Sequence, residues 1–404
     1  MKKREVVLTH AVRTAIGTRG GALKDVPSNE LAACVFRAII DRSGLDPSLV
    51  DGVFMGQTKP STRPMNVARY AWLEAGLPDT VPASTSYRAC CSGIQSIFDA
   101  VQMISYGDAD IMIAGGVDSL NSSVYNLRGA RGGVGHKNAV FMDTLTEHSA
   151  CTIPPAVYGK HTVGWVSDNI AERWNVTREE QDALALQSHN RALEAIEKGY
   201  FKEQIVPING FDTDEHPKHT SMEKLAKLKP SFSPTGTVTA GNASGQNDAA
   251  ACVLLMTREK AEELGLKPEL RFVSAAAVAL DPLILLMGPM KAVPEALEIA
   301  GLKMSDIDLV EMNEAFASSS IASMRELVKL DPKETYEALN ARTNIGGSGI
   351  SLGHPPGATG ALMLTRLLYD MKRLDLHYGM VTMCVGGGHG FASIWERIDG
   401  GENE

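Results

Sequence analysis

The sequence is poor in the features that mark several classes of protein. It has six cysteines among 404 residues, too few for a disulfide framework, and no Cys-x-x-Cys pair that would indicate a structural zinc site. The first ten residues hold an apolar run of only three, whereas a secretory signal needs about 7–15. No stretch approaches the roughly 20 apolar residues of a membrane span. We therefore expect a reduced protein of the cytoplasm without a metal site or a membrane segment.

The charge and the composition narrow the class further. The formal net charge of −9 argues against nucleic acid or an anionic membrane as the main partner, but it leaves room for a local basic patch. Hydrophobic residues make up 44% of the chain and charged residues 22%, which is ordinary for a globular protein. At roughly 100–200 residues per domain, the length predicts two or three domains.

An internal repeat organises the chain. Residues 45–56 align without gaps with residues 302–313, and residues 111–116 align with residues 382–387. Both copies of the first match predict a helix that ends at glycine, a short turn and a buried strand. The second match predicts near-continuous apolar strands, each preceded by a helix. Because the two matches follow the same order, they indicate a duplicated α/β unit.

The segment between the two copies has no counterpart in the repeat. It is rich in loops, and it also predicts a helix over residues 178–198, because Thr177 and Glu180 form a capping-box pattern at its start. The predicted domains are an N-terminal half of residues 1–120 plus 248–269, an inserted loop domain of residues 121–247 and a C-terminal half of residues 270–404.

Two of the reactive clusters lie at expected helix starts. Cys90 and Cys91 precede a helix whose exposed N–H groups and dipole favour a thiolate, although small residues packed at a tight turn are the alternative. The pattern does not say which cysteine reacts. His354 lies among glycines just before another helix, which makes it a candidate base or hydrogen-bond donor.

Two further clusters lie at expected strand ends. Cys384 ends a strand and opens into glycines 386–388, whose N–H groups can bind an oxyanion, a tight turn between strands being the alternative. Asn313 ends the duplicated strand, where α/β sheets often carry ligands and catalytic groups. Together the four clusters suggest nucleophilic Cys/His/Cys chemistry on acyl groups.

These clusters resemble the motifs of the thiolase family and occur in the family's order. The matching segments are Cys90-Cys91-Ser92-Gly93, Thr239 to Gly245, Asn313 to Phe316, Gly353 to Pro355 and Cys384 to Gly388. The resemblance covers nearly the whole chain. It implies an α/β fold of five layers, αβαβα, built from two duplicated halves with an inserted loop domain. It also implies an acyltransferase that cleaves a 3-oxoacyl-CoA with coenzyme A or runs the reverse condensation.

The resemblance implies a role for each motif residue. Cys90 is the nucleophile that carries the acyl group, and His354 activates it. Cys384 is the acid and base at the carbon next to the thioester. Asn313, through a water, and His354 bind the thioester oxygen, while the N–H groups of Cys90 and Gly386 form a second oxyanion hole. Coenzyme A is then a co-substrate, and no cofactor is permanently bound.

The phosphates of coenzyme A call for a basic site despite the acidic total. Residues 217–229 supply several lysines, with a solvated charged face as the alternative interpretation. The resemblance points to nucleotide contacts here and in the stretch from Thr239 to Gly245, with Lys218, Ala240 and Ser244 as the best candidates. A second basic stretch, residues 128–137, is expected to form a subunit contact or a lid.

Departures from the family pattern in the loop domain bear on the substrate. Residues 151–155 and 163–169 differ from the usual family sequence, and Trp165 either shapes the acyl pocket or packs in the loop-domain core, which we favour. The substrate is therefore a general 3-oxoacyl-CoA or a branched, dicarboxylic or aromatic one such as benzoylsuccinyl-CoA.

The assembly and the enzyme class leave alternatives as well. The resemblance implies a homodimer or homotetramer, in which edge strands pair, and leaves open a small accessory subunit. A condensing synthase of the same fold and a non-catalytic scaffold are the rival hypotheses. Cys384 argues against the synthase, and the presence of all four reactive side chains argues against the scaffold.

Overall fold

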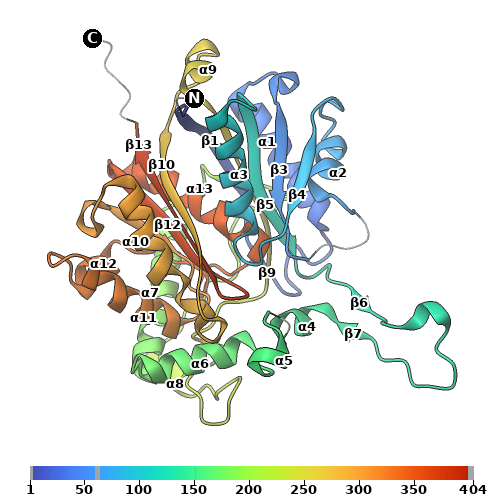
Figure 1. Cartoon of the computed structure of the whole chain (residues 1–404), viewed down its shortest axis with the longest axis vertical. Helices are drawn as coiled ribbons and strands as arrows, with labels where there is room; N and C mark the ends of the chain where they lie inside the picture. The colour runs from blue at the N-terminus through green and yellow to red at the C-terminus, as the bar shows by residue number, and fades with distance from the viewer. Residues whose placement is uncertain (1–2, 60–63, 151, 399–404) are drawn as a thin grey trace.

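The computed structural model describes residues 3–59, 64–150 and 152–398 (Figure 1). Cys151, the first residue of the divergent segment 151–155, lies outside the described residues. The other five cysteines are free thiols. No helix in the described ranges combines the length and the apolar character that crossing a bilayer requires.

The N-terminal half forms a mixed sheet with the strand order β1-β9-β5-β3-β4. β3 is parallel to β4 and β5, whereas β9 is antiparallel to β5 and β1. β5 and β9 are buried along their whole length, as apolar strands covered on both faces should be. The elements are β1 (Val6–Thr14), β2 (Gly17–Thr18), α1 (Ser28–Ser43), β3 (Gly52–Gly56), α2 (Val67–Glu74), β4 (Ala83–Ser86), α3 (Ser92–Tyr106), β5 (Ile111–Ser119), β9 (Asn247–Thr257) and α9 (Arg258–Glu263).

The C-terminal half forms a second sheet with the order β11-β12-β13-β10. β10 pairs antiparallel with β1, Val7 opposite Arg271, so the two sheets share one continuous ladder. β12 and β13 form a hairpin whose tight turn follows Val385. The elements are β10 (Leu270–Ala279), α10 (Gly288–Ala300), β11 (Leu309–Met312), α11 (Ala317–Leu327), α12 (Tyr336–Ala341), α13 (Pro356–Leu374), β12 (Tyr378–Val385) and β13 (His389–Arg397).

Helices α3 and α13 pack against each other between the two sheets. Their core contains Ile97 of α3, Leu364 of α13, Val253 of β9 and Val381 of β12, each at most 1% exposed. Burying one such side chain contributes about 1.5–3 kcal/mol. With α1 and α2 outside the first sheet and α10 and α11 outside the second, the layers read αβαβα (Figure 1). The predicted five-layered fold is confirmed.

The duplication predicted from the sequence is visible in both halves. α1 ends at Gly44 and α10 at Gly301, both in the left-handed conformation with φ of 65° and 69°. A short 3-10 helix then leads into a strand in each case: Pro47–Leu49 into β3, and Met304–Asp306 into β11. Likewise α3 leads into β5, and α13 leads into β12.

The segment between β5 and β9 adds helices at one end of the molecule and an extended arm that projects from it (Figure 1). α7 begins after Thr177 with the expected capping box. The domain boundaries stay a prediction. The elements are β6 (Tyr125–Asn126), β7 (Met142–Asp143), α4 (Thr144–Ala150), α5 (Pro155–Tyr158), α6 (Val163–Arg173), α7 (Arg178–Glu197), β8 (Ile205–Val206) and α8 (Met222–Ala226).

Candidate active site

Cys90 lies on a tight turn between β4 and α3. Ala89, directly before it, has a φ of 44°, a left-handed conformation that is uncommon outside glycine and often marks functional turns. The amides of Cys91 and Ser92 close the turn by donating to the carbonyls of Arg88 and Ala89, at 3.1 and 3.0 Å. Cys90 is half-buried and Cys91 is fully buried. Cys90 is therefore the accessible member of the pair.

Three glycines pack the turn of His354 against that of Cys90. Gly93, in the first turn of α3, and Gly116, in β5, both lie so close to the carbonyl oxygen of Gly357 that a Cβ on either would overlap it. Gly357 is in the first turn of α13, three residues after His354. This contact brings the starts of α3 and α13 to the same end of β5, and glycine is required for it.

His354 is held in one orientation and one tautomer. Its Nδ1 lies 2.7 Å from the hydroxyl of Thr359, and that hydroxyl donates to the carbonyl of Pro355 at 2.8 Å. With the hydroxyl proton directed to Pro355, its oxygen accepts from Nδ1 and Nε2 is left without a proton, which fits the N–H donor of Asn313 that faces Nε2. Burial lowers the pKa of His354 to about 4, so the ring is neutral at pH 7. The side chain presents an unprotonated nitrogen, as a general base requires.

Asn313 converges on the same imidazole from the C-terminal half. It follows β11, and its backbone amide donates to the carbonyl of Thr382 at 3.1 Å. Its Nδ2 lies 3.5 Å from Nε2 of His354, at the outer limit of a hydrogen bond. Its Oδ1 is buried and has no hydrogen-bond partner among the described residues. The pair therefore retains polar groups for a substrate or a water.

The turn between β12 and β13 contacts the turn of Cys90. The amides of Gly386 and of Cys90 itself donate toward the Cys90 sulfur. A Cβ at Gly386 would lie 3.3 Å from Cβ of Ala89 and 3.4 Å from Cγ2 of Thr152, so a side chain there would crowd the residue before Cys90. Cys384 is buried just before this turn and lies close enough for its pKa to respond to Cys90. The segment is thus a tight turn that also supplies one of the two N–H donors, the amide of Gly386.

Burial raises the pKa of both thiols. The pKa of Cys90 rises to about 11, although the two amides that face its sulfur oppose the shift. The pKa of Cys384 rises well above its ordinary value through burial and through the neighbouring Cys90. The N–H groups that face the sulfur favour the thiolate, as expected for a cysteine before a helix, but α3 begins only at Ser92 and desolvation outweighs them. The resting site holds neutral thiols and a neutral imidazole.

Two residues of this region, Asp118 and Lys59, were not predicted from the sequence. Asp118, in β5, is buried and accepts from the amides of Thr58, Lys59 and Gly357 at 3.0, 3.2 and 2.6 Å and from the Thr58 hydroxyl. It thereby ties the end of β3 to the first turn of α13. Lys59 reaches the carbonyl of Thr144 at 3.5 Å. Their position near the ends of apolar strands was the one signal that could have pointed to them.

The predicted coenzyme A contacts lie in two segments, one at Lys218 and one from Thr239 to Gly245. Lys218 and Ala240 are exposed, and the amide of Lys218 donates to Nδ1 of His189 at 3.4 Å. Ser244 is half-buried, and its amide donates to the carbonyl of Ala315 at 3.0 Å. The stretch from Thr239 to Gly245 therefore runs beside the motif that contains Asn313.

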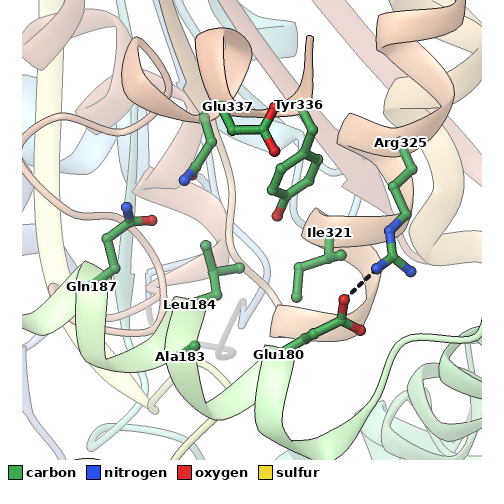
Figure 2. Close-up of a pocket in the computed structure, with 9 residues that line it drawn as sticks. Glu180, Ala183, Leu184, Gln187, Ile321, Arg325, Tyr336 and Glu337 are labelled. Atoms are coloured by element: carbon green, nitrogen blue, oxygen red, sulfur yellow. Dashed lines mark hydrogen bonds and ion pairs between the residues drawn. The ribbon is translucent and has the colours of Figure 1, made fainter.

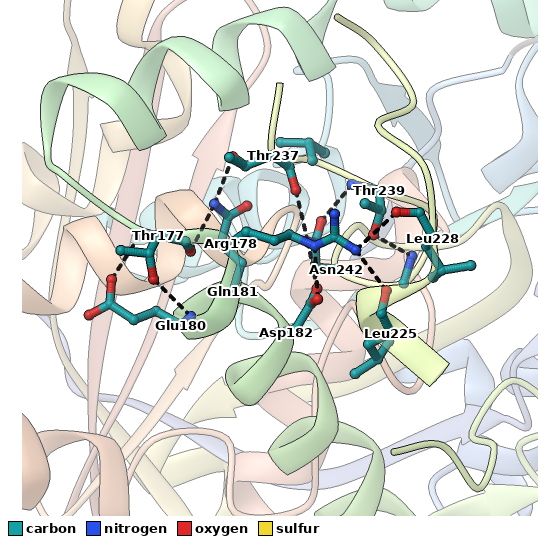
Figure 3. A network of polar contacts seen from close by, with 12 residues as sticks. Thr177, Arg178, Glu180, Gln181, Asp182, Leu225, Leu228, Thr237, Thr239 and Asn242 are labelled. Carbon is teal, nitrogen blue, oxygen red and sulfur yellow. Dashed lines mark hydrogen bonds and ion pairs between the residues drawn. The ribbon is translucent and has the colours of Figure 1, made fainter. Parts of the chain in front are cut away.

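Helix α7 joins the basic segment to the stretch that carries Ala240 and Ser244 (Figure 3). Arg178 donates to the carbonyls of Leu225 and Leu228 at 2.6 and 3.1 Å and to the carboxylate of Asp182 at 2.8 Å. The other oxygen of Asp182 accepts from Nδ2 of Asn242 at 3.0 Å. These contacts fix α8, which carries Lys224, beside the stretch from Thr239 to Gly245.

Two cavities lie away from the catalytic candidates. One, of about 380 Å³, is lined in part by Trp165, which stacks on His161 with ring centroids 3.7 Å apart. The other, of about 510 Å³, lies between α7, α11 and α12, where Glu180 and Arg325 form an ion pair (Figure 2). Within the described ranges, no group of three or more His, Cys, Asp or Glu side chains could hold a metal ion.

Comparison with known proteins assigns the family. Models of the N-terminal and C-terminal domains of thiolase match residues 6–259 and 266–397. The chain belongs to the thiolase family. An acetyl-CoA acetyltransferase of Syntrophomonas wolfei is 42% identical to this thiolase over 403 residues, 98% of this chain and 100% of that protein. Beta-ketothiolase BktB of Cupriavidus necator is 44% identical over 408 residues, with the same coverage of 98% and 100%.

A solved structure agrees with these relatives. The crystal structure of the Bacillus anthracis acetyl-CoA acetyltransferase matches this thiolase with a TM-score of 0.92 at 42% identity, over 98% of this chain and 100% of that one. The predictions of the family, the fold and an acyltransferase enzyme are confirmed. The roles of the individual residues stay predictions.

Proposed function

We propose that this thiolase cleaves a 3-oxoacyl-CoA with coenzyme A, or runs the reverse condensation, through an acyl group on Cys90. One observation carries the proposal: an accessible thiol, a second buried thiol and the starts of α3 and α13 meet at one end of the sheets. There His354 presents an unprotonated nitrogen. These are the groups that nucleophilic acyl transfer with a separate acid and base requires.

The first half-reaction transfers the acyl group to the protein. Nε2 of His354 takes the proton of the Cys90 thiol, and the sulfur attacks the 3-oxo carbon. The bond between C2 and C3 breaks, and the electron pair leaves on C2 as the enolate of the shortened acyl-CoA. Cys384 gives its proton to that carbon. Its raised pKa suits this role, because the thiol keeps its proton until a strong base forms beside it.

The second half-reaction restores the resting site. The Cys384 thiolate takes the proton of coenzyme A, and the coenzyme A sulfur attacks the thioester carbonyl on Cys90. The Cys90 sulfur leaves and regains its proton from His354. The N–H groups of Cys90 and Gly386 stabilise the oxyanion of this step, and each such donor is worth about 10²–10³ in rate. Asn313 and His354 do the same for the thioester oxygen of the enolate.

The coenzyme A site follows from the two segments that α7 joins, the basic segment of residues 217–229 and the stretch from Thr239 to Gly245. We assign the phosphates to Lys218 and its neighbouring lysines, and the pantetheine to the backbone at Ala240 and Ser244. The exposed apolar side chains of Leu228 and Phe232 support this assignment, because they offer a surface for the ligand next to those lysines. Coenzyme A is a co-substrate here, and the chemistry calls for no resident cofactor.

A peptide-mapping experiment tests the proposal. After brief incubation with acetoacetyl-CoA, mass spectrometry should find an acetyl group on Cys90. Cys90→Ser should abolish it, whereas Cys91→Ser should retain it because that side chain faces the core. An adduct on Cys91 alone would overturn the assignment.

A second measurement separates a thiolase from a condensing synthase. Exchange of the methyl protons of acetyl-CoA in D₂O should require Cys384, because this thiol is the base at that carbon. Cys384→Ala should lose the exchange by at least about 100-fold. Retention of most exchange would favour the synthase mechanism.

We further propose a homodimer or homotetramer in the cytoplasm. Among the described strands β4 pairs only with β3, so its outer edge is available to a second copy. The arm between β5 and α4 carries Tyr125 and Phe141, which are 62% and 67% exposed, as an interface would require. Light scattering that finds a stable, active monomer would contradict this. Turnover by the pure chain would exclude a required accessory subunit.

A further inference from the structure

Lys59 and Cys90 lie at the same edge of the N-terminal sheet. β3 and β4 are parallel neighbours, and the amide of Gln57, just after β3, donates to the carbonyl of Ser86, the last residue of β4, at 3.1 Å. Lys59 follows the end of β3 by three residues, and Cys90 follows the end of β4 by four. The carboxyl ends of parallel strands meet at one edge, where substrates of α/β proteins bind.

The backbone of Lys59 is fixed in this place. Its amide and that of Thr58 both donate to Oδ1 of Asp118, and the Thr58 hydroxyl donates to Oδ2. Oδ2 also accepts from the amide of Gly357. The Asp118 carboxylate is thus saturated by donors and is not needed as a partner for the lysine ammonium.

The Lys59 ammonium has no direct ion-pair partner among the described residues. The side chain of Lys59 is half-buried, and its Nζ meets the carbonyl of Thr144 at 3.5 Å, a weak contact. Among the described residues it forms no ion pair within 4.0 Å. Desolvation lowers its pKa, and the charges of the Asp118 and Asp143 carboxylates oppose that shift. A half-buried cation beside a reactive thiol is costly unless an anion binds there.

The lysine also stands apart from the proposed phosphate site. The candidates for coenzyme A are Lys218, before α8, and the stretch from Thr239 to Gly245, which contacts the C-terminal half at Ala315. Lys59 belongs to the N-terminal sheet and contacts Thr144 at the start of α4. An anion that meets Lys59 is therefore expected at the acyl end of the substrate.

We propose that Lys59 binds a carboxylate at the far end of the acyl group, so that the preferred substrates are 3-oxo dicarboxylic acyl-CoA thioesters. The inference rests on the proposed function and names its substrate class. After cleavage, the acyl group left on Cys90 carries the carboxylate. A charge-assisted hydrogen bond of this kind is worth about 10- to 100-fold in selectivity.

Transfer of an acyl group from coenzyme A to Cys90 tests the contact between Lys59 and the carboxylate separately from the cleavage of the carbon–carbon bond. In this step the Cys90 sulfur bonds to the thioester carbon, the bond to the coenzyme A sulfur breaks, and coenzyme A leaves as a thiol with the proton of Cys90. Intact-mass kinetics would compare succinyl-CoA with butyryl-CoA and glutaryl-CoA with pentanoyl-CoA, pairs that differ in the terminal carboxylate. We expect the carboxylated member of at least one pair to react 10-fold or more faster.

Variants of Lys59 test the contact. Lys59→Met should reduce the ratio of the carboxylated to the uncarboxylated rate at least 10-fold, and Lys59→Arg should retain part of that ratio. The control is Lys267→Met, which replaces an exposed lysine on the loop before β10 and should leave the ratio unchanged. Wild-type protein without a carboxylate preference, or a Lys59→Met variant that slows both members equally, would overturn the inference. Failure of every thioester to acylate Cys90 would instead overturn the proposed function.

Discussion

Replacing Thr359 with valine should disable His354 without touching any reacting atom. Valine has nearly the shape of threonine but cannot accept the hydrogen bond that Nδ1 donates at 2.7 Å. The ring is buried, so the lost partner leaves an unsatisfied N–H group, at a cost of about 1–3 kcal/mol. The ring can avoid this cost by moving the proton to Nε2, and the site then loses its base.

Either outcome lowers the rate of acylation of Cys90. A loss of about 1–3 kcal/mol corresponds to roughly 5- to 150-fold in kcat. Because Thr359 is buried behind the imidazole, KM for coenzyme A should change little. The assay is initial-rate thiolysis of acetoacetyl-CoA, with Thr359→Ser as the matched control that keeps the hydroxyl and loses only a methyl group.

The serine variant should remain within about 4-fold of the wild type, since one methyl group is worth about 0.8 kcal/mol. Thermal unfolding should show a cooperative transition for both variants, which separates a local effect from misfolding. Equal losses in the two variants, or full activity of Thr359→Val, would refute the assignment of the tautomer.

Three further predictions follow from the geometry. Gly116→Ala should lower the free energy of unfolding by several kcal/mol, because its Cβ would overlap the carbonyl oxygen of Gly357; an unfolding midpoint within about 2 °C of the wild type would contradict this. Alkylation of Cys90 by iodoacetamide should rise about tenfold per pH unit from pH 7 to 10, because the thiolate reacts and its pKa is about 11; a plateau below pH 8 would contradict the neutral resting thiol. Arg178→Met should raise KM for coenzyme A more than it lowers kcat, since it frees α8; an unchanged KM would show that α8 does not contact the ligand.

The fold was predictable because its signals are local. A glycine after a helix, as at Gly44 and Gly301, and an apolar run after it are visible within some twelve residues, and their repetition gave the duplicated architecture. The capping box of α7 is likewise contained in Thr177 to Glu180. The motif residues were found through a resemblance that spans the chain rather than through any one of these signals.

The rest could not be predicted because it depends on contacts between distant segments. Asp118 accepts a hydrogen bond from Gly357, which is 239 residues away in the sequence, and no local pattern predicts that pairing. The same holds for Cys90, whose place before α3 is local, whereas the burial that raises its pKa and the Gly386 amide that faces its sulfur are visible only in the folded chain. In the sequence, Lys59 is an ordinary charged residue after a strand, and only the folded structure shows which residues surround it.

The charges of the site lead to one conclusion about how it works. Burial favours the uncharged forms of His354, Cys90 and Cys384, so the resting site avoids the cost of separated charges in a dry pocket. Charge then develops only in the reaction, as an imidazolium and a thiolate that form and disappear together. Lys59 differs from this pattern, because the carboxylates of Asp118 and Asp143 favour its charged form against the effect of burial. A lysine that chemistry at Cys90 does not require, and that forms no direct ion pair with the described residues, is best explained by what the substrate brings to it.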